Sequence, residues 1–375
     1  MRRGAIMATP ISLTAAGVVA LAAVLAAAPV GAERRTIYPA SVPAGRPYSP
    51  GVLVGDTLYI SGQLGLPGSG PTPAPMDTQA RQAMDGIGAV LKDAGLGFQH
   101  LVKCHVYLAN MDDYAAMNAA YGSYFTDRVP ARTTVQAAGL VAGAGVEIGC
   151  IAFADLSRIS VVRPPAGSLP APLGPYSPAV WAGDTLYVSG MGGQDPATKT
   201  VGESVEAQAA QTVANIATTL KAAGLGMSDV VWAQGYATRV AEAPALGTAL
   251  GQTVKAPHGL VSVPRLPGPI RAELTFVATK GKGTTAYLDA GASPGTDAAG
   301  EARQAFARLG DGLRQRGLAL TDVALVTMYL SNVADLAAAN AAFLDTFPKG
   351  APARITIVVQ PQATERIRLT AIAAR

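Results

Sequence analysis

Residues 46–62 read RPYSPGVLVGDTLYISG, and residues 174–190 read GPYSPAVWAGDTLYVSG. The two stretches align without a gap, and nearly every position matches. Each has the pattern of a strand, a turn and a second strand. Repetition at this level indicates that one structural unit occurs more than once in the chain.

A helix pattern recurs three times along the chain. Each copy carries an apolar stripe at spacing i, i+3, i+7, which covers one face of a helix. A glycine follows at the C-terminal end (Gly95, Gly224 and Gly317), which suits a helix that ends with a residue in the left-handed αL conformation. The three segments are TQARQAMDGIGAVLKDAGL (78–96), AQAAQTVANIATTLKAAGL (207–225) and EARQAFARLGDGLRQRGL (301–318).

A third copy of the unit is also marked by its second helix. NAAFLDTFPKGAPAR (340–354) repeats NAAYGSYFTDRVPAR (118–132) without a gap. Before its first helix this copy has only TTAYLDAG (284–291), so we expect it to be truncated. A complete copy reads strand, turn, strand, helix, strand, helix, strand, strand. This order predicts an α+β fold with the helices on one face of the sheet.

The N-terminal segment is predicted to be a secretory signal peptide covering residues 1–32. Arg2 and Arg3 form a basic start, residues 12–28 are apolar, and small residues precede a cleavage position after Ala32. A retained membrane anchor is the competing interpretation, because the apolar run is nearly long enough to span a bilayer. The rest of the chain is expected to form three domains, one for each copy of the unit, at 33–157, 163–281 and 282–375.

Composition argues against nucleic acid as a partner. The formal net charge is +4, and removal of Arg2 and Arg3 with the signal peptide leaves +4 − 2 = +2. Basic residues do not form a stripe interleaved with aromatics. The sequence also offers no pair of catalytic histidines, so ribonuclease activity is disfavoured.

The cysteines and histidines give no metal-ligand spacing, and we expect no metal. They are Cys104, Cys150, His100, His105 and His258. Both cysteines lie in strand-like segments. An exported protein could pair them, whereas isolated cysteines on apolar strands are often buried free thiols. The sequence leaves both alternatives open.

An arginine and a glutamate stand out in a chain that is only 14% charged. Arg132 precedes the β-branched run 133–135, and Glu147 lies in the alternating segment VEIGCIAFA (146–154). The guanidinium is suited to a substrate carboxylate, and the glutamate can activate a water. The alternative is a structural Arg–Glu pair at a sheet edge.

Taken together, the motifs resemble the RidA/YjgF family of enamine/imine deaminases. The matching segments are PYSPGV, LYISGQ, NAAYGSYF, VPAR and VEIGCIAFA, and the first copy matches over residues 36–155. The resemblance implies a chorismate-mutase-like α+β fold, homotrimers and sites in clefts between subunits. It implies hydrolysis of 2-imino or enamine acids to 2-oxo acids and ammonia, with no cofactor.

The resemblance also implies roles for single residues. Arg132 would clamp the substrate carboxylate, and Glu147 would position or activate the hydrolytic water. Thr134 stands where the family often has cysteine. The predicted substrate-binding residues are Tyr48, Ser61, Asn118 and Thr134.

The second copy departs from this pattern at the arginine. It keeps Tyr176, Ser189 and Glu273. A gapless alignment puts His258 at the arginine position, and a one-residue shift puts Gly259 there. We therefore expect its site to be degenerate.

The third copy departs at the glutamate. It keeps Asn340 and Arg354, but Arg368 stands near the glutamate position with Glu365 close by. The first copy alone holds both functional residues, so we expect one complete site there. Because family clefts mix neighbouring subunits, the sequence leaves open whether residues of another copy lie beside Arg132.

These expectations combine into one functional prediction. The chain is expected to be an exported imine deaminase, periplasmic or secreted, acting on a small carboxylate substrate. It should not contact the membrane after signal cleavage, and its three copies should form a monomeric pseudo-trimer. The alternative is a protein that binds small carboxylates without catalysis.

Overall fold

A computed structural model describes residues 1, 32–43, 45–70, 72–281, 285–292, 295, 297–361 and 365–375. Apart from its two end residues, the predicted signal peptide lies outside the described residues. Ala32–Arg375 form one compact unit. Across the described ranges, no helix is both long and apolar enough to cross a membrane.

Repeat one forms a six-stranded sheet whose strand order is β1-β2-β3-β7-β4-β5. Helices α1 (Met76–Asp93) and α2 (Tyr114–Gly122) pack on one face. The strands are β1 (Arg34–Ile37), β2 (Gly51–Val54), β3 (Thr57–Gly65), β4 (Leu101–Leu108), β5 (Ala131–Gln136) and β7 (Val146–Phe153).

Repeat two forms a second sheet with the corresponding order β8-β9-β10-β14-β12-β13, and β11 also pairs with β14. Its helices are α3 (Val205–Ala222) and α4 (Ala243–Thr253). Strand β8 begins before the expected boundary at 163. The strands are β8 (Ile159–Val162), β9 (Ala179–Ala182), β10 (Thr185–Val188), β11 (Met191–Gly192), β12 (Val230–Ala237), β13 (His258–Ser262) and β14 (Ala272–Thr279).

Repeat three forms the order β15-β18-β16-β17, which matches β3-β7-β4-β5. Among the described residues it has no counterpart of β1 or β2, as expected for a truncated copy. Strand β6 (Gly139–Leu140) of repeat one pairs with β17 and completes this sheet. The elements are β15 (Ala286–Gly291), α5 (Ala298–Arg314), β16 (Val323–Leu330), α6 (Leu336–Thr346), β17 (Ala353–Val358) and β18 (Ile367–Ala373).

The predicted helix ends are confirmed. Gly95, Gly224 and Gly317 follow α1, α3 and α5 with φ of 78°, 74° and 68°. Only glycine adopts this left-handed conformation without steric cost.

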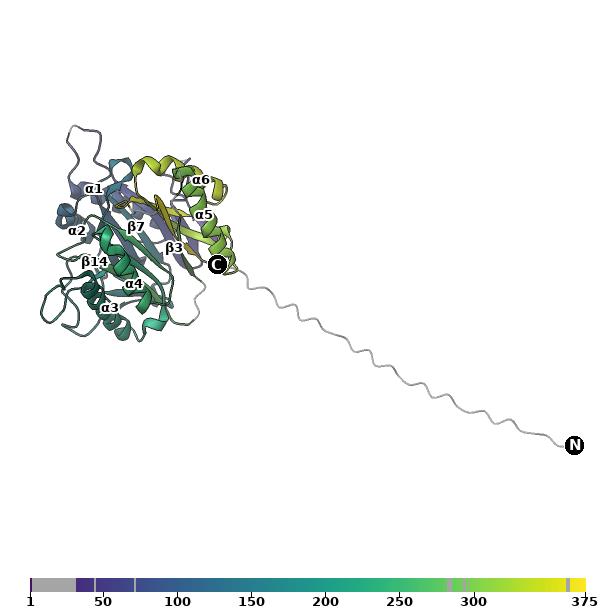
Figure 1. Cartoon of the computed structure of the whole chain (residues 1–375). Coiled ribbons are helices and arrows are strands. Elements are labelled where there is room, and N and C mark those ends of the chain that lie inside the picture. The colour runs from purple at the N-terminus through teal and green to yellow at the C-terminus, as the bar shows by residue number, and fades with distance from the viewer. Residues whose placement is uncertain are drawn as a thin grey trace. The chain divides into compact units, whose positions relative to one another are not determined.

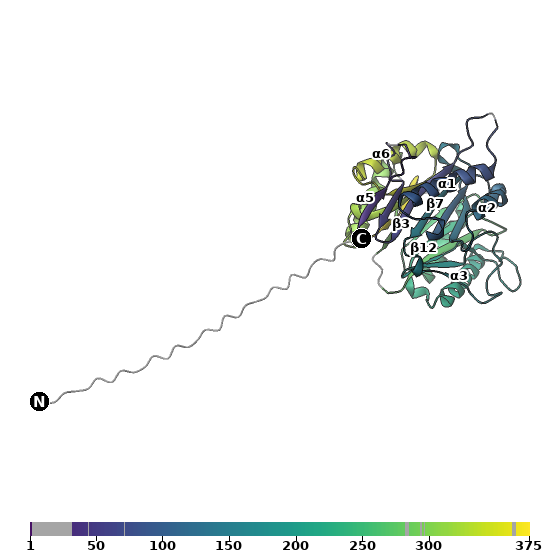
Figure 2. The same ribbon diagram turned by 180° about the vertical axis from the view of Figure 1, so that it is seen from behind.

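The three sheets pack around a common core. Each sheet buries one face under its own two helices, and the opposite faces share one hydrophobic cluster drawn from all three repeats. Helices α1 to α6 therefore lie on the outside, with the sheets between them (Figures 1 and 2). Tyr107, Tyr236 and Tyr329 occupy matching ladder positions in this shared core. The expected pseudo-trimer within one chain is confirmed.

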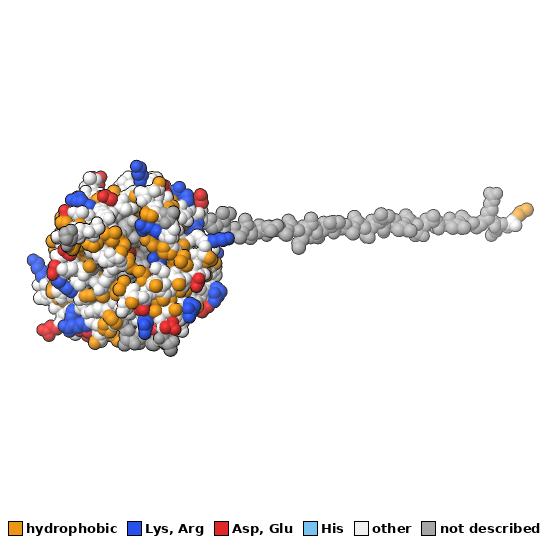
Figure 3. Space-filling model, turned by 90° about the horizontal axis from the view of Figure 1, so that it is seen from above, with side chains coloured by type: hydrophobic (Ala, Val, Ile, Leu, Met, Phe, Trp, Pro, Cys, Tyr) orange, Lys and Arg blue, Asp and Glu red, His pale blue; other side chains and the backbone are white. Residues whose placement is uncertain are grey.

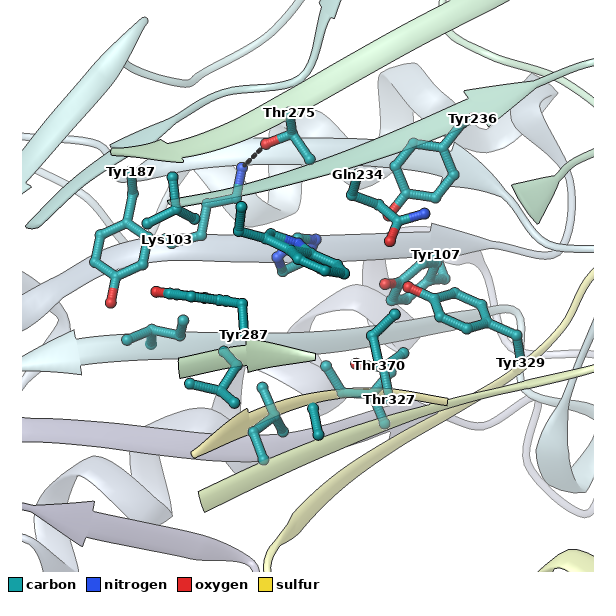
Figure 4. Close-up of a pocket in the computed structure, with 18 residues that line it drawn as sticks. Lys103, Tyr107, Tyr187, Gln234, Tyr236, Thr275, Tyr287, Thr327, Tyr329 and Thr370 are labelled. Carbon is teal, nitrogen blue, oxygen red and sulfur yellow. Dashed lines mark hydrogen bonds between the residues drawn. The ribbon is translucent and has the colours of Figure 1, made fainter. Parts of the chain in front are cut away.

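A small internal cavity of about 60 Å³ lies where the three sheets meet (Figure 4). The buried Lys103 ammonium donates hydrogen bonds of 2.8 Å to Thr133 Oγ1, Thr275 Oγ1 and the Val188 carbonyl. Burial lowers the pKa of Lys103 to about 7, against an opposing effect of Glu273. Among the described residues its lining contains neither an arginine nor a carboxyl group, the two groups expected in the site, so we place the functional sites elsewhere.

The two cysteines form a disulfide. Cys104 on β4 and Cys150 on β7 lie directly opposite each other in the antiparallel ladder, with Cα atoms 4.1 Å apart. Of the two alternatives open from the sequence, the structure contains the paired form. Both residues belong to the apolar core between the first sheet and its helices.

Candidate functional site

Arg132 and Glu147 do not share a site. Strand β4 lies between β5, which carries Arg132, and β7, which carries Glu147. Each side chain instead meets residues of a different neighbouring repeat. The expectation of one complete site made by repeat one is therefore corrected, because the sites form at junctions between sheets.

The backbone fixes the first junction, between repeats one and two. The Arg132 N–H donates to Ser189 Oγ at 2.8 Å, and the Gly190 N–H donates to the Arg132 carbonyl at 2.9 Å. The Ser177 N–H donates to the Pro130 carbonyl at 3.1 Å. The Pro-Tyr-Ser and Ser-Gly motifs of repeat two thus bind the Pro-Ala-Arg strand of repeat one.

The Arg132 side chain is buried among tyrosines, with only 2% of the residue exposed. Its guanidinium carbon lies 4.9 Å from the ring centroid of Tyr121 and 5.6 Å from that of Tyr176. Nη2 donates to the Tyr114 hydroxyl at 3.2 Å. Nη1 is buried and has no hydrogen-bond partner among the described residues. A buried cation with a free donor is suited to an anionic ligand.

Glu273 completes this junction, which we call the Arg132 site. Arg132, Tyr176, Gly190 and Glu273 line a cavity of about 60 Å³. A Cβ on Gly190 would lie 2.0 Å from Glu273 Oε1, so only glycine leaves room for the carboxyl group. Burial raises the pKa of Glu273 to about 8, while Lys103 and Arg132 act to lower it.

The junction between repeats three and one, the Arg354 site, repeats these contacts. The Arg354 N–H donates to Ser61 Oγ at 2.8 Å, and Nη1 donates to Asn340 Oδ1 at 2.7 Å. The guanidinium carbon lies 4.5 Å from the Tyr48 ring and 5.1 Å from the Phe343 ring. Burial lowers the pKa of Arg354 to about 10.

Glu147 is the carboxyl group of the Arg354 site. Its Oε1 accepts a hydrogen bond from the Thr356 N–H at 3.1 Å, and Oε2 has no partner among the described residues. A Cβ on Gly62 would lie 1.8 Å from Oε1, which matches Gly190 at the other site. Burial raises the pKa of Glu147 to about 8, while the Thr356 N–H and Arg354 act to lower it.

The third junction, between repeats two and three, has lost this pattern. His258 pairs with Ala233 in the ladder, as Arg132 pairs with Cys104 in repeat one. The register therefore places His258, and not Gly259, at the arginine position. Arg368 stands at the glutamate position. It binds Asp289 through contacts of 2.8 and 2.5 Å and Glu365 at 2.5 Å. Its charge is neutralised within the protein.

Comparison with known proteins identifies the family. The family profile described as "Endoribonuclease L-PSP" matches residues 39–154 and 167–280. The chain belongs to this family. The prediction of the RidA/YjgF family of enamine/imine deaminases is confirmed.

Curated relatives of this RidA/YjgF chain match one repeat each. A goat (Capra hircus) 2-iminobutanoate/2-iminopropanoate deaminase is 47% identical over 122 residues, covering 32% of this chain and 89% of the relative. The Escherichia coli K12 protein of that name is 37% identical over 123 residues, covering 32% of this chain and 96% of the relative. The crystal structure of RidA from an Antarctic Psychrobacter is 30% identical, covers 31% of this chain and 98% of that chain, and has a TM-score of 0.30.

The predicted RidA-type site residues are divided between the two junctions. Tyr48, Ser61 and Glu147 lie at the Arg354 site. Arg132, Asn118 and Thr134 lie at the Arg132 site. The last two have buried oxygens, Asn118 Oδ1 and Thr134 Oγ1, without a hydrogen-bond partner among the described residues. Their roles stay predictions.

Sequence reasoning missed the aromatic residues that hold the arginines. Tyr114 and Tyr121 of α2 contact Arg132, and Phe343 of α6 contacts Arg354. Tyr121 and Phe343 each follow the helix asparagine by three residues. This recurrence places the aromatic ring beside the asparagine on one helix face and could have identified it.

No group of three or more His, Cys, Asp or Glu side chains within the described ranges could hold a metal ion. On the face drawn in Figure 3, basic and acidic side chains are interspersed. What the two sites do offer is a cation for a carboxylate and a buried carboxyl group for proton transfer.

Proposed function

We propose that this chain is an imine deaminase with two active sites, one containing Arg132 and Glu273 and the other containing Arg354 and Glu147. The substrate is a 2-imino acid or its enamine tautomer, and the products are the 2-oxo acid and ammonia. The observation that carries the proposal is the same pairing at both sites, a ring-lined buried arginine beside a buried carboxyl group. Relatives named 2-iminobutanoate/2-iminopropanoate deaminase support the reaction type.

The arginine would bind the substrate carboxylate. Its two terminal nitrogens match the two carboxylate oxygens, and the surrounding tyrosine rings exclude water from the contact. This binding places the imine carbon next to the glutamate. Fixing both reactants in this way supplies proximity, which accounts for a large share of the rate enhancement in many enzymes.

The glutamate would carry the proton. As a carboxylate it accepts a proton from water while the water oxygen forms a bond to the imine carbon. The protonated glutamate then returns the proton to the nitrogen of the tetrahedral adduct. The glutamate next takes the proton of the adduct's hydroxyl group and passes it to the nitrogen, so that the C–N bond breaks, ammonia leaves and the C=O bond forms. A pKa near 8 leaves the group able to accept and return a proton at neutral pH.

A trapping assay tests the proposal. An amino-acid oxidase generates the imino acid in the presence of semicarbazide, which forms an absorbing semicarbazone. The purified protein should slow this trapping and increase the yield of 2-oxo acid. Unchanged trapping at high protein concentration would contradict deaminase activity. Binding of 2-oxo acids without slower trapping would support carboxylate binding alone.

We also propose that the chain is exported, to the periplasm or outside the cell. The basic start, the apolar run and the small residues before Glu33 support this. The Cys104–Cys150 disulfide is in keeping with an oxidising compartment.

A further inference from the structure

The Arg132 site opens into a larger apolar pocket. This second cavity measures about 310 Å³ and shares Leu173, Tyr176, Gly190 and Ile270 with the 60 Å³ cavity around Arg132. We call it the linker pocket, because much of its wall is the proline-rich linker between β8 and β9. Its volume lies at the lower end of the roughly 300–1,000 Å³ typical of small-molecule sites.

Proline and aliphatic side chains form most of the lining. The linker contributes Pro164, Pro170 and Leu173, and the loop before β14 contributes Pro267 and Pro269. Proline fixes its own backbone φ, so these walls keep their shape without a ligand. A preformed apolar wall binds apolar groups without a large ordering cost.

The Asn215 side chain in the pocket already has hydrogen-bond partners within the protein. Asn215 Nδ2 donates to the carbonyls of Gly192 and Gln194, each at 3.0 Å, and its Oδ1 accepts from Gln211. No charged side chain is among its lining residues in the described part of the chain. The pocket therefore favours hydrocarbon over a polar or charged group.

The Arg354 site differs at the corresponding positions. Gly192 pairs with Glu273 in the β-ladder, whereas Leu64 pairs with Glu147. A side chain thus stands beside Glu147 where the Arg132 site has only a hydrogen atom. The connection between β8 and β9, residues 163–178, is also longer than the corresponding connection between β1 and β2, residues 38–50. The two sites differ in the space next to the carboxyl group.

We propose that the linker pocket binds the substrate side chain and makes the Arg132 site select imino acids with large apolar side chains, such as those derived from leucine, methionine or phenylalanine. The proposal rests on the proposed function for the orientation of the substrate. With the carboxylate on Arg132 and the imine carbon near Glu273, the side chain extends past Tyr176 and Gly190 into the pocket. The apolar surface of the substrate side chain is then removed from water, which favours binding.

Binding of the product 2-oxo acids tests the selectivity without requiring catalysis. Calorimetry uses the Arg354→Ala protein, in which the Arg132 site is the remaining arginine site. We expect 4-methyl-2-oxopentanoate and phenylpyruvate to bind at least roughly tenfold more tightly than pyruvate, because each added buried carbon increases affinity several-fold. Arg132→Ala in the same background should remove this binding.

Two variants that fill the pocket test its location. Gly192→Leu introduces the residue of the Arg354 site, and the first contact of its Cβ is the flexible end of Ile270. Ala166→Trp adds a ring to an exposed lining residue, so it leaves the core intact. Each should reduce the preference for the large ligands by at least about tenfold. Arg163→Trp, on the same linker and outside the lining, is the matched control and should retain the preference.

Pyruvate bound as tightly as the large oxo acids would overturn the proposal, and so would an unchanged preference in both filled variants. A clear preference for large oxo acids in a protein that does not slow semicarbazide trapping would contradict the deaminase function and leave the side-chain subsite standing. The two failures are therefore distinguishable.

Discussion

Replacement of Arg132 by alanine should disable one of two sites and leave the other at work. The guanidinium is buried, and its loss leaves no other cationic side chain among the described residues that line the cavity. Arg354 lies in a different junction with its own carboxyl group, Glu147. A single substitution should therefore reduce imine hydrolysis to the share contributed by the Arg354 site, and not to zero.

The magnitude at the altered site follows from the contact that is lost. A hydrogen bond to a charged group contributes about 1.5–3 kcal/mol, and a bidentate carboxylate contact has two of them. The loss of ~3–6 kcal/mol corresponds to a reduction of roughly 10²- to 10⁴-fold at that site. At this size the remaining turnover at the Arg132 site is negligible beside an intact Arg354 site.

Combined substitutions reveal which residues work together. Adding Glu273→Gln to Arg132→Ala should have almost no further effect, because both residues serve the same site. Adding Glu147→Gln to Arg132→Ala should remove nearly all activity, because it disables the second site. The pairing within repeat one, which the sequence favoured, predicts instead that Arg132→Ala alone removes the activity, so that neither second substitution has a further effect.

The semicarbazide assay measures these rates, and circular dichroism checks that each variant is folded. His258→Ala is the matched control, because His258 has the same ladder position as Arg132 at the junction without a glutamate. It should keep the parent rate. If Arg132→Ala with Glu147→Gln were as active as Arg132→Ala alone, the assignment of Glu147 to a separate site would be wrong.

Four further predictions concern the pH dependence of the Arg354 site, the mature N-terminus and the assembly. In the Arg132→Ala protein, kcat/KM should rise with pH through an apparent pKa near 8 as Glu147 becomes a carboxylate, and a flat profile would exclude it as the base. The folded-state pKa of Glu147 lies above its ordinary value of 4.5, so its contribution to stability is fully present below pH 4.5 and is lost as pH rises toward 8. The melting temperature of the Glu147→Gln protein, relative to that of the parent, should therefore be higher at pH 9 than at pH 5. An equal difference at both pH values would contradict the raised pKa of Glu147. N-terminal sequencing of the exported protein should begin at Glu33, and light scattering should give one chain per particle, whereas an intact Met1 or a particle of three chains would contradict these expectations.

Local structure was predictable from the sequence where local chemistry determines it. The helix stripes and their glycine stops at Gly95, Gly224 and Gly317 follow from period and backbone conformation, and the structure has both. The ladder register also settled what the alignment left open, since it places His258 and not Gly259 at the arginine position. A strand pairing fixes the side of the sheet that every residue faces.

The composition of the sites was not predictable in the same way. Arg132 and Glu147 are close in sequence, yet β4 inserts between their strands because it pairs with β5 in parallel and with β7 in antiparallel orientation. Their actual partners, Glu273 and Arg354, are set by the packing of whole sheets. Even β6 follows this packing, since it leaves repeat one to pair with β17. Such contacts depend on tertiary structure and leave no local pattern.

The distribution of losses among the repeats argues that the surviving pairs are functional. In a trimer of identical subunits every junction would hold the same arginine and glutamate. Repeat two has lost the arginine and repeat three has lost the glutamate, and both losses fall on the same junction, where His258 faces the repeat that carries Arg368. If the arginine and the glutamate had been lost at two different junctions, only one junction would have kept both residues. At the third junction Arg368 binds Asp289 and Glu365, so structural ion pairs stand where the other two junctions have an arginine beside a buried carboxyl group. Fusion of the repeats in one chain permits this, because the degenerate junction still holds the two junctions of the proposed sites in place.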